Sequence, residues 1–313
     1  MSVCSETDAV ENLTKILGTN NFIIHSIGNH NLGRHLVYRI ESPFREPFIY
    51  KQYCKKNRRA RELTALQKLE FTDVPCPRIK SYGVTEHGIE WIMLSCLEGN
   101  MLDNFWDQLN KLQKRDVFFQ MGSILSAMHS VEKYDQFGYW NEKGECSYEI
   151  HDYYTEFCRR NETVFRQLEN QYLPDKSLLE KAVSAIKNHS VMVKEIKESR
   201  LTHQDYDGRN IMVSIEGNNA RISGVLDFEQ SSAGNTEIDL SDVYSRYFLK
   251  SDEFEAQFIE GYHKNLPIDP NFYHRLPLYL LCKGVTICSW SYMKAPDYYR
   301  EGIELIRLMV ERI

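Results

Sequence analysis

The stretch that decides the fold is THQDYDGRNIMV, residues 202–213, followed by SGVLDFE, residues 223–229. Two short apolar segments here, 211–215 and 220–226, flank the turn-forming residues 216–219 and predict a β-hairpin. The sequence on both sides of this hairpin has the periodicity of helices. Because loops carried by a rigid scaffold often hold functional groups, this interruption is where the chemistry is expected.

The polar residues of this stretch have the types and order that phosphoryl transfer requires. That reaction uses a carboxylate to orient and deprotonate the attacking hydroxyl, and oxygen ligands for a Mg²⁺ ion on the nucleotide phosphates. Asp205 is the candidate catalytic base. Asn210 and Asp227 are the candidate metal ligands, since Mg²⁺ prefers hard oxygen donors, one or two of them carboxylates.

This arrangement resembles the aminoglycoside phosphotransferase and choline kinase branch of the protein-kinase-like superfamily. The segment HQD, residues 203–205, together with Asn210 matches the catalytic loop of that branch, and GVLDFE, residues 224–229, matches its metal motif. A protein kinase is disfavoured, because Glu229 stands where Asp-Phe-Gly has its glycine and no Ala-Pro-Glu segment follows. The resemblance also implies that Asp239 braces the catalytic loop through hydrogen bonds, although residues 235–236 depart from the family's Asp-Pro.

The first hundred residues predict a small sheet with one helix, in the order β, β, β, α, β, β after a short N-terminal helix. Lys51 lies on the third predicted strand, where the family places the lysine that holds the α- and β-phosphates. Glu62 lies on the following helix and resembles the acidic partner of that lysine. The predicted elements are a helix at 10–17, strands at 22–27, 36–40 and 48–52, a helix at 58–69, and strands at 79–83 and 89–95.

Two further segments are candidates for nucleotide binding. Gly28 and Gly33 bound a turn that either covers the nucleotide or is a plain hairpin turn. They have the spacing of a Walker A motif, but Arg-His at 34–35 replaces the Lys and Ser/Thr which that motif needs. The segment after the last strand resembles the family's hinge, whose backbone binds the purine. Its candidates are Ser95, Cys96 and Leu97.

Candidate substrate contacts are carboxylates that would pair with an ammonium group, beside aromatic rings that give cation–π contacts. Asp207 in the catalytic loop and Glu229 after the metal motif are two of them. Asp152 and Glu156 lie on a predicted helix at 149–168, where a solvated acidic helix face is the alternative interpretation. A further helix is predicted at 178–197.

Composition limits the function further. The chain has 313 residues, 42% of them hydrophobic, and a net charge of −6, which is typical of a globular protein without a polybasic nucleic-acid surface. Its eight cysteines contain no Cys-x-x-Cys pair, so free thiols in a reducing cytoplasm are expected rather than structural zinc. The N-terminus lacks the pattern of a signal peptide, and no apolar stretch reaches the length of a membrane span.

These observations predict an α+β, bilobal protein-kinase-like fold, with a nucleotide-binding lobe at 1–97 and a mainly helical catalytic and substrate-binding lobe at 98–313. The resemblance implies Mg²⁺-dependent phosphoryl transfer from ATP or GTP to a hydroxyl of a small cationic molecule. An aminoglycoside is the favoured acceptor. Choline, ethanolamine or another amino alcohol is the alternative acceptor. A nucleotide-binding scaffold without activity is the rival from another class.

Overall fold

The computed structural model describes residues 4–28, 30, 33–43 and 45–313. Residue contacts divide the chain into two compact units. Unit 1 comprises Met1–Val117, Trp140–Glu145 and Gly208–Ser231, and unit 2 comprises Phe118–Tyr139, Cys146–Asp207 and Ser232–Ile313. By these contacts the hairpin that carries Asn210 and Asp227 belongs with the N-terminal sheet. The functional boundary expected between Leu97 and Glu98 stays a prediction.

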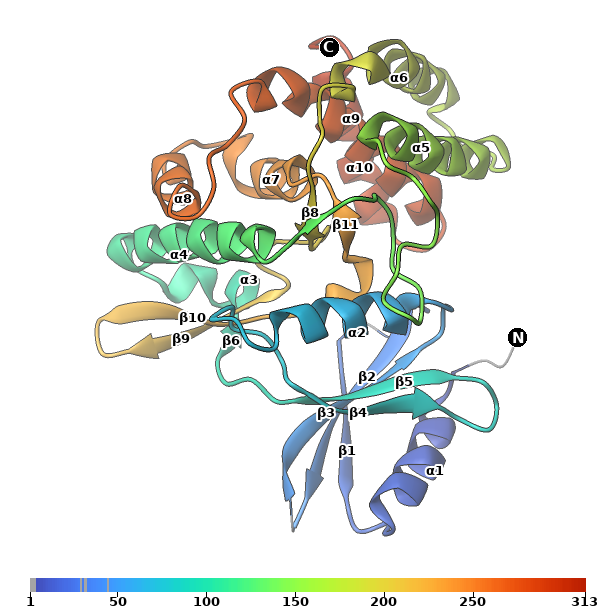
Figure 1. The fold of residues 1–313 in the computed structure, drawn as a ribbon, viewed down its shortest axis with the longest axis vertical. Helices are drawn as coiled ribbons and strands as arrows, with labels where there is room; N and C mark the ends of the chain where they lie inside the picture. Colours follow the sequence, from blue (N-terminus) through green and yellow to red (C-terminus); the bar gives the residue numbers. More distant parts are fainter. Residues whose placement is uncertain (1–3, 29, 31–32, 44) are drawn as a thin grey trace. The chain divides into compact units, whose positions relative to one another are not determined.

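Unit 1 is built on an antiparallel sheet in which five described strands follow the order β1-β2-β3-β5-β4 (Figure 1). The predicted order of strands and helices is confirmed. Helix α1 begins at Glu6 instead of Val10, because the Ser5 hydroxyl accepts a hydrogen bond from the Asp8 N–H at 3.1 Å and caps the helix. The elements are α1 (Glu6–Leu17), β1 (Ile23–Ile27), β2 (His35–Ser42), β3 (Arg45–Tyr53), α2 (Arg58–Leu69), β4 (Ile79–Val84) and β5 (Glu90–Ser95).

The two faces of this sheet are covered by different helices, because successive side chains of a strand point to opposite faces. Tyr50 of β3 and Trp91 of β5 pack in one apolar cluster with Leu13 of α1. Lys51, the neighbour of Tyr50, therefore faces the other side, where α2 supplies Glu62 at 2.7 Å. The alternation along β3 thus separates the packing side chains from a buried charged pair.

The rest of unit 1 is formed by the hairpin and the chain leaving β5. Strands β9 and β10 pair antiparallel as predicted, and β6, which was not predicted, adds a third strand beside β9. Gly99 precedes β6 with φ +120°, and a Cβ there would lie 2.5 Å from the carbonyl oxygen of Val213, so only glycine allows this approach. The elements are β6 (Asn100–Met101), α3 (Leu102–Phe105), the start of α4 (Lys111–Ser130), β9 (Ile211–Glu216) and β10 (Asn219–Val225).

Unit 2 is mainly helical (Figure 1). Helices α5, α6, α9 and α10 share one apolar core. Helix α5 begins at Tyr153, because Asp152 caps it by accepting a hydrogen bond from Thr155 N–H at 2.8 Å. The helix predicted at 178–197 is wrong in its second half, since α6 ends at His189. The elements are β7 (Lys133–Tyr134), α5 (Tyr153–Glu169), α6 (Lys176–His189), β8 (Ser199–Thr202), β11 (Ser232–Gly234), α7 (Glu237–Val243), α8 (Glu255–Tyr262), α9 (Phe272–Ser291) and α10 (Pro296–Met309).

Neither a disulfide nor a helix suited to span a membrane occurs among the described residues. All eight cysteines lie among the described residues, and none of them forms a disulfide. Within the described part of the chain, no helix combines the length and the apolar character that a membrane span needs.

Helices α4 and α8 cross in unit 2 through a pair of glycines. A Cβ at Gly261 would lie 1.9 Å from the Phe119 carbonyl oxygen, and one at Gly122 would lie 2.0 Å from that of Phe258. Both obstacles are backbone atoms, so a side chain at either position would push the two helices apart.

Replacing Gly261 by alanine should therefore destabilise the protein by about 1–3 kcal/mol, the usual effect of overpacking a close contact. Urea unfolding followed by circular dichroism measures this change. Glu260→Ala is the matched control, because Glu260 is an exposed residue of the same helix, and its effect should stay within about 0.5 kcal/mol. Equal unfolding midpoints for the two variants would contradict the tight crossing.

Candidate active site

Lys51 is the centre of a charged cluster in unit 1. Its side chain is 4% exposed, and its ammonium group donates hydrogen bonds to Glu62 Oε2 and Asp227 Oδ1, both at 2.7 Å. Glu229 Oε2 lies 3.4 Å away. Burial alone would lower the pKa of Lys51, but the three carboxylates outweigh it and raise that pKa above its usual value. The lysine therefore stays protonated in spite of its burial.

Asn210 and Asp227 stand at the same end of the β9–β10 hairpin. Ile211 pairs with Val225, and beyond this pair the Leu226 N–H donates to the Asn210 carbonyl oxygen at 2.8 Å. The strand register therefore brings the two predicted metal ligands to neighbouring places at the ends of the two strands. Asp227 has φ +61°, a conformation that costs a non-glycine residue about 1–3 kcal/mol and is often retained at functional sites.

Their donor atoms fit the predicted Mg²⁺, because a carboxylate and an amide both offer hard oxygens. Asp227 retains 27% exposure of its side chain while Oδ1 accepts from Lys51. Asn210 is largely buried. Asn210 and Asp227 are therefore the residues that would hold the ion.

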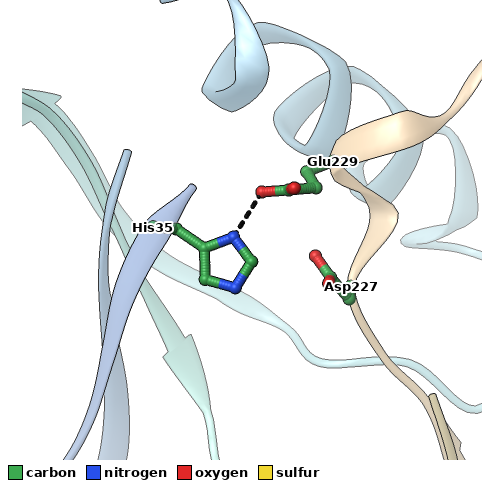
Figure 2. Close-up of side chains that lie close together, drawn as sticks. All are labelled: His35, Asp227 and Glu229. Atoms are coloured by element: carbon green, nitrogen blue, oxygen red, sulfur yellow. Dashed lines mark hydrogen bonds and ion pairs between the residues drawn. The ribbon is translucent and has the colours of Figure 1, made fainter. Parts of the chain in front are cut away.

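His35 and Glu229 form a contact that was not predicted. Nδ1–H of His35 donates to Glu229 Oε2 at 2.7 Å, as Figure 2 shows. Nitrogen and oxygen atoms of His35, Asp227 and Glu229 lie within 4.8 Å of one another (Figure 2). Lys51 lies 2.7 Å from Asp227 and 3.4 Å from Glu229, so this trio is better explained as part of the lysine cluster than as a separate metal site.

Glu229 is 2% exposed and points into this cluster. Burial by itself would raise the pKa of Glu229, but Lys51 and the hydrogen bond from His35 outweigh it and hold the pKa well below its usual range. The Glu229 carboxylate is thus already paired with Lys51 and His35 inside unit 1. This pairing favours a role in ordering Lys51 over the predicted contact with a substrate ammonium group.

Of the three hinge candidates, Leu97 lies against the hairpin. Ser95 ends β5, and its N–H donates to the Arg78 carbonyl oxygen at 2.9 Å. The side chain of Leu97 covers Gly224, where a Cβ would lie 2.2 Å from Leu97 Cδ1. A side chain at position 224 would therefore displace the end of the Leu97 side chain. Cys96, the third candidate, is partly buried.

Gly28 and Gly33 have φ +79° and +62°, the left-handed region that glycine adopts without strain. They therefore suit the turn between β1 and β2. Residues 29 and 31–32 of the proposed nucleotide-covering loop lie outside the described residues. The nucleotide role of the loop stays a prediction.

In unit 2, the backbone before Asp205 is held by a buried carboxylate. The N–H groups of His203 and Gln204 donate to the two oxygens of Asp239 at 2.7 and 2.6 Å. His129 is hydrogen-bonded to Asp239 Oδ2 at 2.9 Å. Asp239 thus braces the loop as the resemblance implied, while the part played by His129 had no signal in the sequence.

Asp205 and Asp207 lie on a tight turn of the same loop. The Asp205 N–H donates to His203 Nδ1 at 3.2 Å, and the Asp207 N–H donates to the Asp205 carbonyl oxygen at 3.2 Å. The intervening Tyr206 is fully buried and donates through its hydroxyl to the Met121 carbonyl oxygen at 2.9 Å. Asp207 is 2% exposed, which is unfavourable for a contact with a large hydrated substrate.

The remaining substrate candidates have structural partners. Asp152 caps α5, and the hydrogen bond from Thr155 N–H lowers the pKa of this carboxyl. Glu156 is 1% exposed, and its oxygens accept hydrogen bonds from Arg159 at 2.8 Å and from Arg160 at 2.6 Å. These contacts favour helix capping and charge pairing over the predicted binding of a cationic substrate.

Asp242 is a buried carboxyl in this part of the chain that the sequence did not single out. Burial raises the pKa of Asp242 to about 6, while Lys283, which donates to Oδ1 at 2.7 Å, opposes the shift. Asp239 and Asp205 add to the raising effect.

Comparison with known proteins gives the family context of these two units. Residues 34–276 match the phosphotransferase enzyme family. A search of curated protein sequences found no match. The fold is similar to that of aminoglycoside phosphotransferase APH(4)-Ia, with a TM-score of 0.74 and 12% identity over 98% of this chain and 99% of that one.

Two other solved structures have the same fold. A putative aminoglycoside phosphotransferase from Ralstonia eutropha JMP134 has a TM-score of 0.68 and 16% identity over 98% of this chain and 97% of that one. An APH(2") enzyme in complex with GDP and kanamycin has a TM-score of 0.66 and 14% identity over 93% of each chain. The predicted α+β, protein-kinase-like fold is therefore confirmed.

Proposed function

The chain belongs to the phosphotransferase enzyme family, and we propose that it transfers the γ-phosphoryl group of ATP or GTP to a hydroxyl of a small cationic molecule. The observation that carries this proposal is the buried Lys51, held between Glu62 and Asp227 in the unit that also contains Asn210. Positioning of nucleotide phosphates requires a lysine, an acidic partner for that lysine and a metal-binding aspartate. A scaffold protein has no need of all of them.

Each of these residues has a defined task in the proposed reaction. Asp205 orients the acceptor hydroxyl and accepts its proton as the oxygen attacks the γ-phosphorus. Lys51 steadies the α- and β-phosphates, and Glu62 holds the lysine in place. Asn210 and Asp227 would hold Mg²⁺, which when bound neutralises the charge that builds up on the phosphate oxygens.

We assign nucleotide binding to residues 1–97 and catalysis with substrate binding to residues 98–313. Lys51 and the hinge candidates Ser95, Cys96 and Leu97 support the first assignment, and Asp205 supports the second. None of the eight cysteines forms a disulfide, which agrees with a reducing cytoplasm, where ATP and GTP are available.

The acceptor is proposed to be an aminoglycoside. Structures with this fold include a mutant of APH(4)-Ia in ternary complex with ADP and hygromycin B, and an APH(2") enzyme with GDP and kanamycin. The net charge of −6 agrees with a cationic acceptor. Choline and ethanolamine carry the same two groups, a hydroxyl and a cationic nitrogen, and serve as the competing acceptors in the test.

A coupled assay of nucleotide consumption tests this proposal, with ATP and GTP supplied separately and Mg²⁺ present. Aminoglycosides are compared with choline, ethanolamine and other amino alcohols, and mass spectrometry checks each hit for addition of one phosphate. We expect turnover with at least one aminoglycoside. Turnover with amino alcohols alone would overturn the acceptor, and failure of Mg²⁺-nucleotide to raise the melting temperature would overturn the function itself.

A further inference from the structure

Gln204, the residue before Asp205, has φ +64°. This left-handed backbone costs a residue with a side chain about 1–2 kcal/mol, so surrounding contacts must hold it. The φ of Gln204 also sets the direction in which the chain enters Asp205. Asp239 holds the backbone of Gln204 through its N–H at 2.6 Å, and the contacts of the Gln204 side chain therefore bear on where the Asp205 carboxylate points.

The side chain of Gln204 is fixed by hydrogen bonds at both ends. Its Oε1 accepts from Arg160 Nη1 at 2.7 Å and from the Tyr139 hydroxyl at 3.5 Å. Its Nε2 donates to Thr202 Oγ1 at 3.1 Å and to Ser232 Oγ. The bond from Arg160 is the one in this set that carries a full charge, and charge-assisted hydrogen bonds are roughly twice as strong as neutral ones.

Arg160 is itself held rigidly. Its Nε donates to Glu156 Oε1 at 2.6 Å, and its Nη2 donates to Ser232 Oγ at 3.1 Å. The guanidinium carbon lies 4.3 Å from the centroid of the Tyr139 ring, a cation–π contact. Ser232 therefore contacts both Arg160 and Gln204, and the planar guanidinium group links α5 to the loop in one geometry.

We propose that Arg160 is a positioning residue, which holds Gln204 in the left-handed conformation and thereby aims the carboxylate of Asp205. Glu156 supports it by compensating the charge of the guanidinium group. The inference rests on the proposed function, because it takes Asp205 as the base. The competing explanation is that Arg160 only packs α5 in unit 2.

The helix provides a matched control for this proposal. Both arginines donate to Glu156, Arg159 through Nε and Nη2 at 2.8 Å and Arg160 through Nε. The guanidinium group of Arg159, however, stacks on the ring of Tyr148. Arg159→Met therefore removes a guanidinium partner of Glu156 and spares the contacts of Gln204. Arg160→Met removes both kinds of contact.

Steady-state kinetics of the full-length protein should separate the two explanations. Arg160→Met is expected to lower kcat by about 10²-fold, since misplacing a reacting group by about 1 Å has this effect. The KM for nucleotide and the melting temperature should change no more than they do in Arg159→Met. Equal kcat values for the two variants would overturn the proposal.

A double-mutant cycle tests the route through Gln204. Gln204→Gly removes the side chain that Arg160 holds, while glycine adopts the same φ without strain. In that background, Arg160→Met should change kcat by less than about twofold, the scatter expected for removal of an interaction that is already absent. An undiminished loss in the glycine background would show that Arg160 acts by another route.

Two further variants guard against misfolding of Arg160→Met and test the proposed base independently. If Arg160→Met does not fold, Arg160→Lys replaces it, because lysine keeps the buried charge but lacks the planar fork that reaches Glu156, Gln204 and Ser232 together. Asp205→Asn is measured in parallel. Full activity of Asp205→Asn would refute the proposed base itself, whereas an inactive Asp205→Asn beside a fully active Arg160→Met would refute only the inference drawn from Arg160.

Discussion

Replacing Asp205 by asparagine should lower kcat by about 10²- to 10⁴-fold, the range that a positioned general base contributes. Asparagine has nearly the same shape, but its amide does not accept the proton of the attacking hydroxyl. The hydrogen bonds that the N–H groups of His203 and Gln204 donate to Asp239 remain, so the loop should keep its conformation. Turnover is measured with the acceptor found in the screen, and nucleotide affinity by isothermal titration calorimetry.

Nucleotide affinity should stay within about threefold of wild type, because the change removes a step of the reaction and leaves the proposed phosphate contacts of Lys51 intact. Asp252→Asn is the control, since Asp252 is an exposed aspartate of the same unit. It should leave turnover unchanged. Wild-type kcat in Asp205→Asn would show that another group takes the proton.

Asp227→Asn is expected to lower kcat/KM by about 10²- to 10³-fold, as loss of one preorganised charged group does in comparable sites. The asparagine amide oxygen still accepts a hydrogen bond from Lys51, so the cluster should persist. The negative charge that a Mg²⁺ ion requires is lost. Mg²⁺ should therefore strengthen nucleotide binding in the wild type and change it little in the variant, as calorimetry with and without the ion would show.

Glu216→Gln is the control for this second experiment. Glu216 lies on the same hairpin, and its side chain is 63% exposed. It should keep both turnover and the effect of Mg²⁺ on nucleotide binding. If Asp227→Asn retains the effect of Mg²⁺, the ion is held by other residues and the assignment of Asp227 is wrong.

Much of the fold was readable from local patterns. Segments rich in β-branched and aromatic residues, separated by turn signals, located β1 to β5, and helical periodicity located α2 and α5. The ends of helices were less predictable, because they depend on single caps such as Ser5 and Asp152. The strands β6, β7, β8 and β11 were missed, since strands this short acquire their hydrogen bonds from partners distant in the sequence.

The site divides in the same way. Asp205, Asn210 and Asp227 could be named because they lie close together along the chain in a recognisable order. The contact of His35 with Glu229 could not be predicted, because the two residues are 194 positions apart. No local sequence pattern contains both of them. The link from Arg160 to Gln204 is equally remote from any local signal, and it involves a helix that the sequence associated with substrate binding.

The sequence by itself determined which chemical groups this protein has and which of them the chain brings together within a few residues. It predicts a catalytic aspartate, two oxygen ligands and a lysine with an acidic partner. Only the tertiary structure decided which distant residues complete the contacts of Lys51, Glu229 and Arg160. The physical reason is that a buried charge is stable only beside an opposite charge or a hydrogen-bond partner, and packing selects that partner from distant parts of the chain.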